Sequence, residues 1–190
     1  MSERPILFCG EMVRAILAGR KTQTRRPVKG APTNPEAYLL GLYKPTATWG
    51  IHADIDKDGG VWRGHCPFGQ PNDRLWVKET IVREVSSTEE PWAISLYAAD
   101  GTITPADAWP WAREVLSSIH CPRGLSRILL EIVSVRVERL QDISDADAAA
   151  ECFESRDAFL SAFRAMYKLG LNDNPWLWVV EFKMLEDRTK

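Results

Sequence analysis

The residues best suited to chemistry lie in one stretch of eight, from Gly19 to Arg26, which contains one Lys, three Arg and two Thr. A threonine hydroxyl such as that of Thr24 can act as the nucleophile in acyl transfer. The amine of Lys21 can accept the hydroxyl proton where burial or neighbouring cations favour the neutral amine. By residue type alone, the stretch indicates either a catalytic corner or an exposed basic turn, and both interpretations stay open.

The elements around this stretch decide whether Lys21 and Thr24 can act together. Side chains alternate along a strand, so a regular strand would send these two to opposite faces. The apolar residues before the stretch have helical spacing, and Gly19 is expected to end that helix and permit a bend. We therefore expect a helix over residues 11–18 and an extended segment over residues 22–28.

Composition predicts one folded domain over residues 1–190. The chain is 45% hydrophobic and has eight Trp, which is enough for a substantial core. Its formal charge is −2 and its pI is about 6.0. Proteins that grip long nucleic acids usually carry a basic excess. A small substrate, or contact with only a few nucleotides, therefore fits this chain better.

The cysteines and the apolar segments indicate the compartment. None of the four Cys is in a C-x-x-C pair, and neither a signal peptide nor an apolar run of about 20 residues is apparent. We expect a cytoplasmic protein without a membrane partner, whose thiols are reduced and pack as small hydrophobes. The cysteines are Cys9, Cys66, Cys121 and Cys152.

Two His–Cys pairs, His65-Cys66 and His120-Cys121, raise the question of a zinc site. Such a site needs four ligands on short loops. The two pairs lie about 55 residues apart, and adjacent residues rarely bind the same ion. We expect neither a metal nor another cofactor.

Hydrophobic periodicity predicts the other elements. Strands are expected over residues 6–8, 74–83, 92–97, 127–140 and 176–185, with a hairpin that pairs 50–54 with 61–65. Ser144, followed three residues later by Asp147, is expected to cap one helix. Ser155 is expected to cap a second helix, over residues 156–169, and Gly170 is expected to end it.

This order of elements predicts an α+β fold, specifically a small mixed or antiparallel β-barrel with helices packed outside. Few of the strands are joined by simple crossover helices, and the strand over residues 127–140 is long enough to bend across a barrel. Two long insertions, over about residues 30–70 and 84–125, are expected between barrel strands.

Several polar or aromatic side chains outside the basic stretch are candidates for substrate contact. Glu79 lies on the more apolar face of its strand, where a carboxylate should be paired or functional. An ion pair with an Arg of residues 20–26 is favoured over contact with a base edge. Trp76 could stack on a pyrimidine, although a core position is favoured, and Arg26 could support the stretch or contact substrate. Arg127 is expected to be a solvated loop cation rather than a phosphate ligand.

The spacing Gly19-x-Lys21-x-x-Thr24-x-Arg26 resembles the signature Gly-x-Lys-x-x-Thr-x-Arg of the ASCH domain family, in the PUA-like superfamily. The resemblance covers both ends of the chain and the strand expected from residue 74, and it is greatest to longer phage and metagenomic members. Asn72 replaces the Gly that usually precedes the Asp at the start of this strand, but a turn tolerates Asn nearly as well. The later matching segments are Asp73-x-Leu75-x-Val77, Leu140-x-x-Ile143-Ser144 and Val179-Val180-Glu181-Phe182.

This resemblance implies a PUA-like barrel and an activity. Small bacterial members of the family are N4-acetylcytidine amidohydrolases that use a Lys, a Thr and a Glu. The Lys and Thr correspond to Lys21 and Thr24, and the Glu corresponds to Glu151 when counted from the helix start. Glu154 is a structural rival for the third position, and Glu79 is a functional rival.

The implied substrate is an N4-acylated cytidine nucleoside, with Arg26, Glu79 and Trp76 as candidate binding residues. Two other functions stay open: a non-catalytic module that binds RNA or a modified base, and an RNA-cleaving nuclease of the same family. RNA is therefore the alternative partner. The sequence leaves the oligomeric state undetermined.

Overall fold

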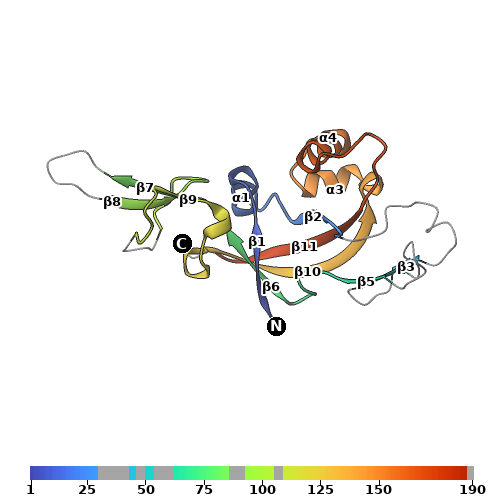
Figure 1. Cartoon of the computed structure of the whole chain (residues 1–190), viewed down its shortest axis with the longest axis horizontal. Coiled ribbons are helices and arrows are strands. Elements are labelled where there is room, and N and C mark those ends of the chain that lie inside the picture. The colour runs from blue at the N-terminus through green and yellow to red at the C-terminus, as the bar shows by residue number, and fades with distance from the viewer. Residues whose placement is uncertain (30–42, 46–49, 54–61, 86–92, 105–108, 188–190) are drawn as a thin grey trace. The chain divides into compact units, whose positions relative to one another are not determined.

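The protein is described from a computed structural model, which describes residues 1–29, 43–45, 50–53, 62–85, 93–104 and 109–187 (Figure 1). The chain forms two compact units whose segments alternate along the sequence. Unit 1 comprises Met1–Lys21, Asn72–Glu131 and Lys183–Lys190, and unit 2 comprises Thr22–Pro71 and Ile132–Phe182. The expected single domain over residues 1–190 stays a prediction.

The first sheet of unit 1 contains both parallel and antiparallel pairs. β1 (Glu3–Leu7) runs parallel to β6 (Arg74–Lys78), and β6 pairs antiparallel with the first residues of β10 (Ile128–Arg139). Burial alternates along β6: Leu75 and Val77 are fully buried, and the residues on either side of them are half-buried. One face of this strand therefore belongs to the core.

Left-handed residues stand at two turns of unit 1 that the sequence motifs single out. Helix α1 (Gly10–Leu17) ends just before Gly19, which has φ 70°, so the predicted helix stop is confirmed. Asn72, at the position where the resembled family has Gly, also has φ 70°. Asn adopts this conformation more readily than most residues, which explains why it can replace Gly there.

The strand expected over residues 74–83 is divided in two, so that prediction is wrong. β6 ends at Lys78, and the chain resumes as β7 (Ile81–Val85) in a separate sheet. Glu79 and Thr80 lie at the break. Alternation with period two persists across such a break, so the sequence pattern does not separate one long strand from two consecutive short ones.

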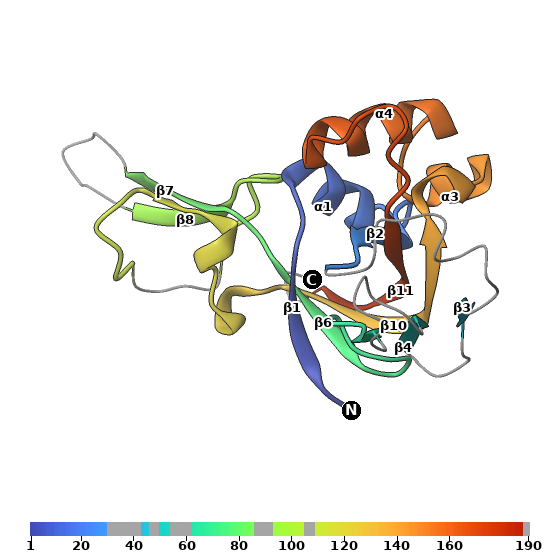
Figure 2. The same ribbon diagram turned by 45° about the vertical axis from the view of Figure 1, so that its right-hand side comes forward.

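The second sheet of unit 1 is antiparallel, with the order β8-β7-β9. Figure 2 shows β7 and β8 side by side. Its other strands and the neighbouring 3-10 helices are β8 (Ala93–Tyr97), β9 (Val115–Leu116), η1 (Ser118–His120) and η2 (Arg123–Leu125). A small core lies beside it, formed by Ile81, Tyr97, Leu116 and Cys121 and flanked by Trp109, Trp111 and Leu125.

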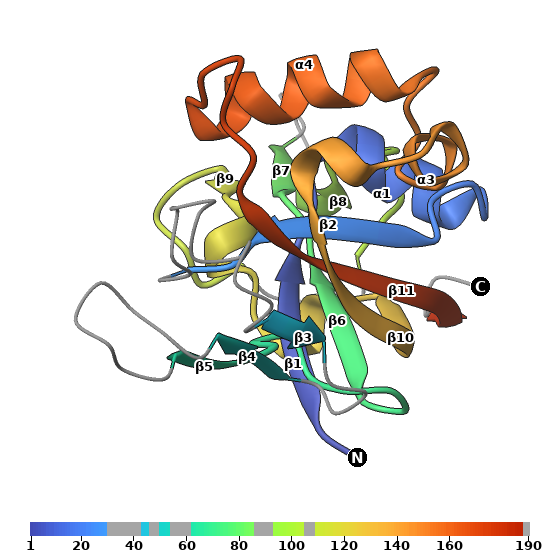
Figure 3. The ribbon, with the colours of Figure 1, turned by 90° about the vertical axis from the view of Figure 1, so that its right-hand side faces the viewer.

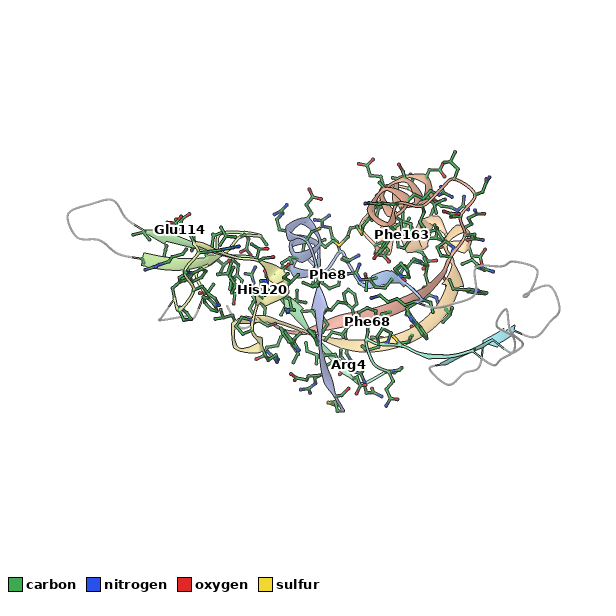
Figure 4. The ribbon with its side chains drawn as sticks, viewed as in Figure 1. Arg4, Phe8, Phe68, Glu114, His120 and Phe163 are labelled. Carbon is green, nitrogen blue, oxygen red and sulfur yellow. The ribbon has the colours of Figure 1, made fainter. Side chains whose placement is uncertain are left out.

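Unit 2 places two helices over strands. Its elements include β2 (Gln23–Pro27), η3 (Leu140–Asp142), α3 (Asp145–Ala150), α4 (Arg156–Tyr167) and the first part of β11 (Trp176–Asp187). β2 pairs antiparallel with β11, and α3 and α4 lie on the same side of these strands (Figures 1 and 3). The core between them consists of Leu140, Ile143, Ala148, Phe159, Leu160, Phe163 and Leu177, and Phe163 is labelled in Figure 4.

The predicted helix caps are confirmed. Ser144 accepts a hydrogen bond from the Asp147 amide, and the Asp147 carboxylate accepts one from the Ser144 amide, which completes a capping box. Ser155 caps α4 by accepting from the Ala158 amide. The predicted end of α4 is wrong, because the helix stops at Tyr167 and Lys168, with φ 55°, forms the left-handed cap in place of Gly170.

Unit 2 also contains a separate antiparallel sheet, with the strand order β3-β4-β5. Its strands are β3 (Tyr43–Pro45), β4 (Gly50–Ala53) and β5 (Trp62–His65). The pairing of β4 with β5 confirms the predicted hairpin, whose turn lies outside the described residues.

The fold is α+β with mixed sheets, as predicted, but the described strands form open sheets rather than a closed barrel. A closed barrel needs every strand to be paired on both sides. The strands in and beside each insertion region form a sheet of their own, β3-β4-β5 in one case and β8-β7-β9 in the other. They therefore do not close another sheet. Within the described part of the chain, no helix is long and apolar enough to cross a bilayer.

We predict that Gly19→Ala lowers the free energy of unfolding by about 1 kcal/mol, because a Cβ strains a residue with positive φ. Apart from the glycine and its two chain neighbours, no atom lies within 4 Å of the added Cβ, so contact with the rest of the protein does not contribute. Gly124→Ala is the matched control, since that site is equally open but its φ is not in the left-handed range. Equal stability changes for the two variants in urea unfolding would contradict this explanation.

Candidate functional site

Lys21 is the last residue of the first segment of unit 1, and it is buried. The residue is 2% exposed, and its Nζ lies 5.8 Å from the ring centroid of Phe8, which is labelled in Figure 4. Its backbone amide donates to the Ala15 carbonyl, 3.2 Å away, so it still belongs to the turn that ends α1. Its neighbours Arg20 and Thr22 are exposed. The interpretation as an exposed basic turn is therefore wrong for Lys21 itself.

Thr24 lies in unit 2, on β2, where it is 1% exposed and pairs with Val180 of β11. Two backbone hydrogen bonds fix the chain just before this strand: the Thr22 amide donates to the Ala150 carbonyl, and the Phe182 amide donates to the Thr22 carbonyl. β2 begins only at Gln23. The residues between Lys21 and Thr24 are therefore not all in a regular strand. The alternation of a regular strand, which would send these two side chains to opposite faces, thus does not apply over the whole segment.

Glu151 is brought to the motif strand within unit 2. It is the C-cap residue of α3 and is 3% exposed. Its Oε1 lies 3.7 Å from Nη1 of Arg25, on β2. Glu154, the rival candidate nearby, is exposed.

Arg25 is a further residue of this site, to which the sequence assigned no role beyond that of a cation near Lys21. Its guanidinium is fully buried, with Nη2 2.8 Å from Glu138 Oε2 and 3.3 Å from Asp147 Oδ1. Its Cζ lies 5.9 Å from the ring centroid of Phe159. An available signal was its position two residues after Gln23, on the same face of β2.

A network of charged side chains surrounds this guanidinium in unit 2. Gln23 donates to the carbonyl and the carboxylate of Asp147, both at 2.9 Å. Arg136 forms ion pairs with Glu138, Glu181 and Asp147, the last at 2.9 Å. The carboxylates of Glu138 and Asp147 are therefore shared by two arginines.

Asp147 has a pKa well below its ordinary value. Burial alone would raise the pKa, but hydrogen bonds from Gln23 and Ser144 and the charge of Arg25 outweigh the loss of solvation. Its carboxylate therefore holds three elements together, namely β2, β10 and the start of α3.

Glu79 belongs to a second buried ion-pair cluster, in unit 1. Its two oxygens accept hydrogen bonds from Arg127 at 3.1 and 2.9 Å, and Arg127 also pairs with Asp100 at 2.9 Å. The predicted ion pair of Glu79 is confirmed in kind, but its described partner is Arg127 rather than an Arg of residues 20–26. The prediction that Arg127 is a solvated loop cation is wrong, because its side chain is 1% exposed.

The Arg127 guanidinium also lies against the ring of Tyr97, with Cζ 4.1 Å from the ring centroid. Burial would lower the pKa of Arg127, but its bonds to Glu79 and Asp100 raise it further above its ordinary value. Burial raises the pKa of the Tyr97 hydroxyl, which donates to the Leu125 carbonyl at 2.8 Å. These contacts indicate that the cluster stabilises the fold of unit 1.

The other two candidate binding residues lie in different units. Trp76 of unit 1 is half-buried, and its ring centroid is 5.7 Å from Lys78 Nζ and 6.0 Å from Arg123 Cζ. Arg26 of unit 2 is half-buried and pairs with Trp178 in the β2–β11 ladder.

The four cysteines are free thiols. Cys66 and Cys121 are buried, as expected of small hydrophobes, but Cys9 is exposed, so the prediction is wrong for that residue. In the part of the chain that the structure describes, no group of three or more His, Cys, Asp or Glu side chains is arranged to hold a metal ion.

Comparisons with known proteins give two solved structures. An ASCH domain from Lactobacillus crispatus JV V101 is 13% identical, with a TM-score of 0.46 over 96% of this chain and 79% of that one. A protein from Enterococcus faecalis V583, assigned to DUF984, is 10% identical, with a TM-score of 0.46 over 100% of this chain and 78% of that one. No family model and no curated protein matches the chain. Likenesses this distant, with TM-scores of 0.46, carry no functional information.

We predict that Asp147→Asn destabilises the protein at neutral pH by about 1–3 kcal/mol, because it weakens charge-assisted hydrogen bonds to two arginines. The folded-state pKa is below the unfolded one, so the contribution of Asp147 is complete above about pH 5 and is lost as the pH falls further. The stability difference between wild type and variant should therefore shrink on acidification. Asp157→Asn, in the first turn of α4, is the control. A difference that is constant from pH 7 to pH 3 would refute the linkage.

Removing one partner of the Glu79–Arg127 pair should lower the free energy of unfolding far more than replacing both partners with apolar residues. We predict that Glu79→Gln costs about 3–5 kcal/mol, because it leaves a buried guanidinium without a full counter-charge. The double variant Glu79→Leu with Arg127→Met should recover much of that loss. Asp100→Asn is the control, since Asp100 is 26% exposed and should matter less. Denaturant unfolding measures all of these, and additive losses in the double variant would contradict the prediction.

Proposed function

We propose that the chain is an ASCH-type amidohydrolase that removes the acyl group from N4-acylated cytidine, with N4-acetylcytidine as the first substrate to test. The observation that carries this proposal is the burial of all three residues that the motif resemblance selects. Lys21, Thr24 and Glu151 are 2%, 1% and 3% exposed. Lys and Glu are rarely buried so completely unless they are paired, so their burial is more than an exposed basic turn would explain.

In the proposed reaction, the Oγ of Thr24 attacks the acyl carbonyl carbon while the amine of Lys21 takes the hydroxyl proton. The tetrahedral intermediate collapses as the C–N4 bond breaks, and Lys21 returns the proton to the leaving N4 amine. Cytidine leaves and the acyl group stays on Thr24 as an ester. Water then hydrolyses this ester, which releases the carboxylic acid and regenerates the hydroxyl.

Glu151 is proposed to orient the reacting groups by a charge-assisted hydrogen bond, either to the Lys21 amine or to the N4 group. Backbone N–H groups near the turn are proposed to stabilise the oxyanion. The 4-amino group of cytosine is an aromatic amine and a better leaving group than an alkyl amine. A modest catalytic apparatus is therefore sufficient for the proposed reaction.

Binding of single-stranded RNA is the second candidate function, and the surroundings of Trp76 favour it. The ring has Lys78 and Arg123 within 6 Å of its centroid. An aromatic face beside cations suits a stacked base with its phosphate. However, Arg123 is also paired with Glu3, and the chain carries a net charge of −2, which weakens the case.

We predict that the purified protein converts N4-acetylcytidine to cytidine and acetate, followed by the change in ultraviolet absorbance. Lys21→Ala and Thr24→Val should each lower kcat by about 10²–10⁴-fold, because each removes a group that acts in the transition state. Arg20→Ala and Thr22→Val are matched controls, since these exposed neighbours lie in the same stretch. Both controls should keep near wild-type activity.

Three outcomes would change the assignment. Full activity in Thr24→Val excludes the nucleophile, and wild-type turnover in Glu151→Gln excludes Glu151 from the third role. No turnover by wild type, together with RNA binding that Trp76→Ala abolishes, replaces the amidohydrolase with the second candidate function.

A further inference from the structure

We propose that Arg25 is the positioning residue for Glu151, an inference that rests on the proposed function. Arg25 occupies a variable position of the motif Gly19-x-Lys21-x-x-Thr24-x-Arg26, so the resemblance assigns it no role. Its role follows from its contacts within unit 2. It directs one edge of a buried guanidinium at the carboxylate of Glu151.

Two carboxylates anchor the guanidinium through a single nitrogen. Nη2 of Arg25 lies 2.8 Å from Glu138 Oε2 and 3.3 Å from Asp147 Oδ1. A guanidinium is planar, so fixing Nη2 and the side-chain stem fixes the direction of Nη1 as well. Nη1 is the nitrogen that lies 3.7 Å from Glu151 Oε1.

Because both side chains are buried, this contact strongly affects the position of the Glu151 carboxylate. The side chains of Arg25 and Glu151 are 0% and 3% exposed, so neither exchanges its partner for bulk water. A buried carboxylate that loses a nearby cation is held less firmly and can turn toward solvent. Such a movement would misplace the group that the proposed reaction needs, and small displacements of catalytic groups are costly.

The fork of arginine is what the arrangement requires. Arg25 contacts three carboxylates, those of Glu138, Asp147 and Glu151, from two nitrogens. Lysine presents one compact charge on a flexible stem and has no planar fork. We therefore expect Arg25→Lys to keep the fold better than Arg25→Met but to leave Glu151 poorly oriented.

Arg136 provides the matched control in the same network. It shares Glu138 and Asp147 with Arg25, but its third carboxylate partner is Glu181. Arg136→Met therefore removes the same charge from the same cluster without removing the Arg25–Glu151 contact. A merely structural role for Arg25 predicts similar effects of the two substitutions on catalysis.

The first test is a double-mutant cycle on turnover of N4-acetylcytidine. We expect Arg25→Met to lower kcat by about 10- to 100-fold with little change in KM, and Arg25→Lys to fall between it and wild type. In a Glu151→Gln background, Arg25→Met should add little, because the residue on which it acts is already lost. Full additivity in that background, or wild-type kcat in both Arg25 variants, overturns the proposal.

The second test does not depend on activity. The carboxyl carbon-13 signal of Glu151, identified by its loss in Glu151→Gln, is recorded at neutral pH in wild type, Arg25→Lys, Arg25→Met and Arg136→Met. Its chemical shift should change in Arg25→Met, because the guanidinium beside the carboxylate is lost, and stay near wild type in Arg136→Met. An unchanged chemical shift in the Arg25 variants overturns the positioning role even where turnover is intact. Absence of turnover by wild type overturns the proposed function instead, which separates the two failures.

Discussion

The packing of α3 against β2 in unit 2 depends on the ion pairs of one buried guanidinium, that of Arg25. Taking the Arg25 side chain out of water costs several kcal/mol, and only well-placed carboxylates offset that cost. Glu138 on β10, Asp147 in the first turn of α3 and Glu151 at the end of α3 supply them. The pairing therefore fixes how β2 lies against α3, and with it the strand that carries Thr24.

Unit 1 uses the same device at a different place. Arg127 is buried between Glu79 and Asp100 and lies against Tyr97, just where the ladder of β6 ends and β7 begins. In both units a charge inside the core is tolerated because its partners are held by separate elements. Such pairs add less to stability than apolar packing of the same volume, but they allow few alternative arrangements. That property suits a protein whose proposed chemistry needs buried polar groups in defined positions.

Local signals in the sequence were reliable where one residue acts on its own backbone. The capping box of Ser144 and the cap of Ser155 need only a side chain that reaches an amide within three residues. Gly19 ends α1 because glycine accepts a positive φ at little cost, and Asn72 accepts it nearly as well. The hairpin of β4 and β5 was predictable for a similar reason, since its partners are close in sequence.

The sequence by itself determined the α+β class and Glu79 as a carboxylate that needs a partner, and it selected the stretch from Gly19 to Arg26 as the proposed site. Only the tertiary structure decided which partner that is, that the sheets stay open, and that Glu151 meets Arg25. The physical reason is the range of each interaction. Caps and turns are written within a few neighbouring residues, whereas an ion pair joins residues such as Arg25 and Glu151 that are far apart in the chain, and charge alone does not choose among many possible partners.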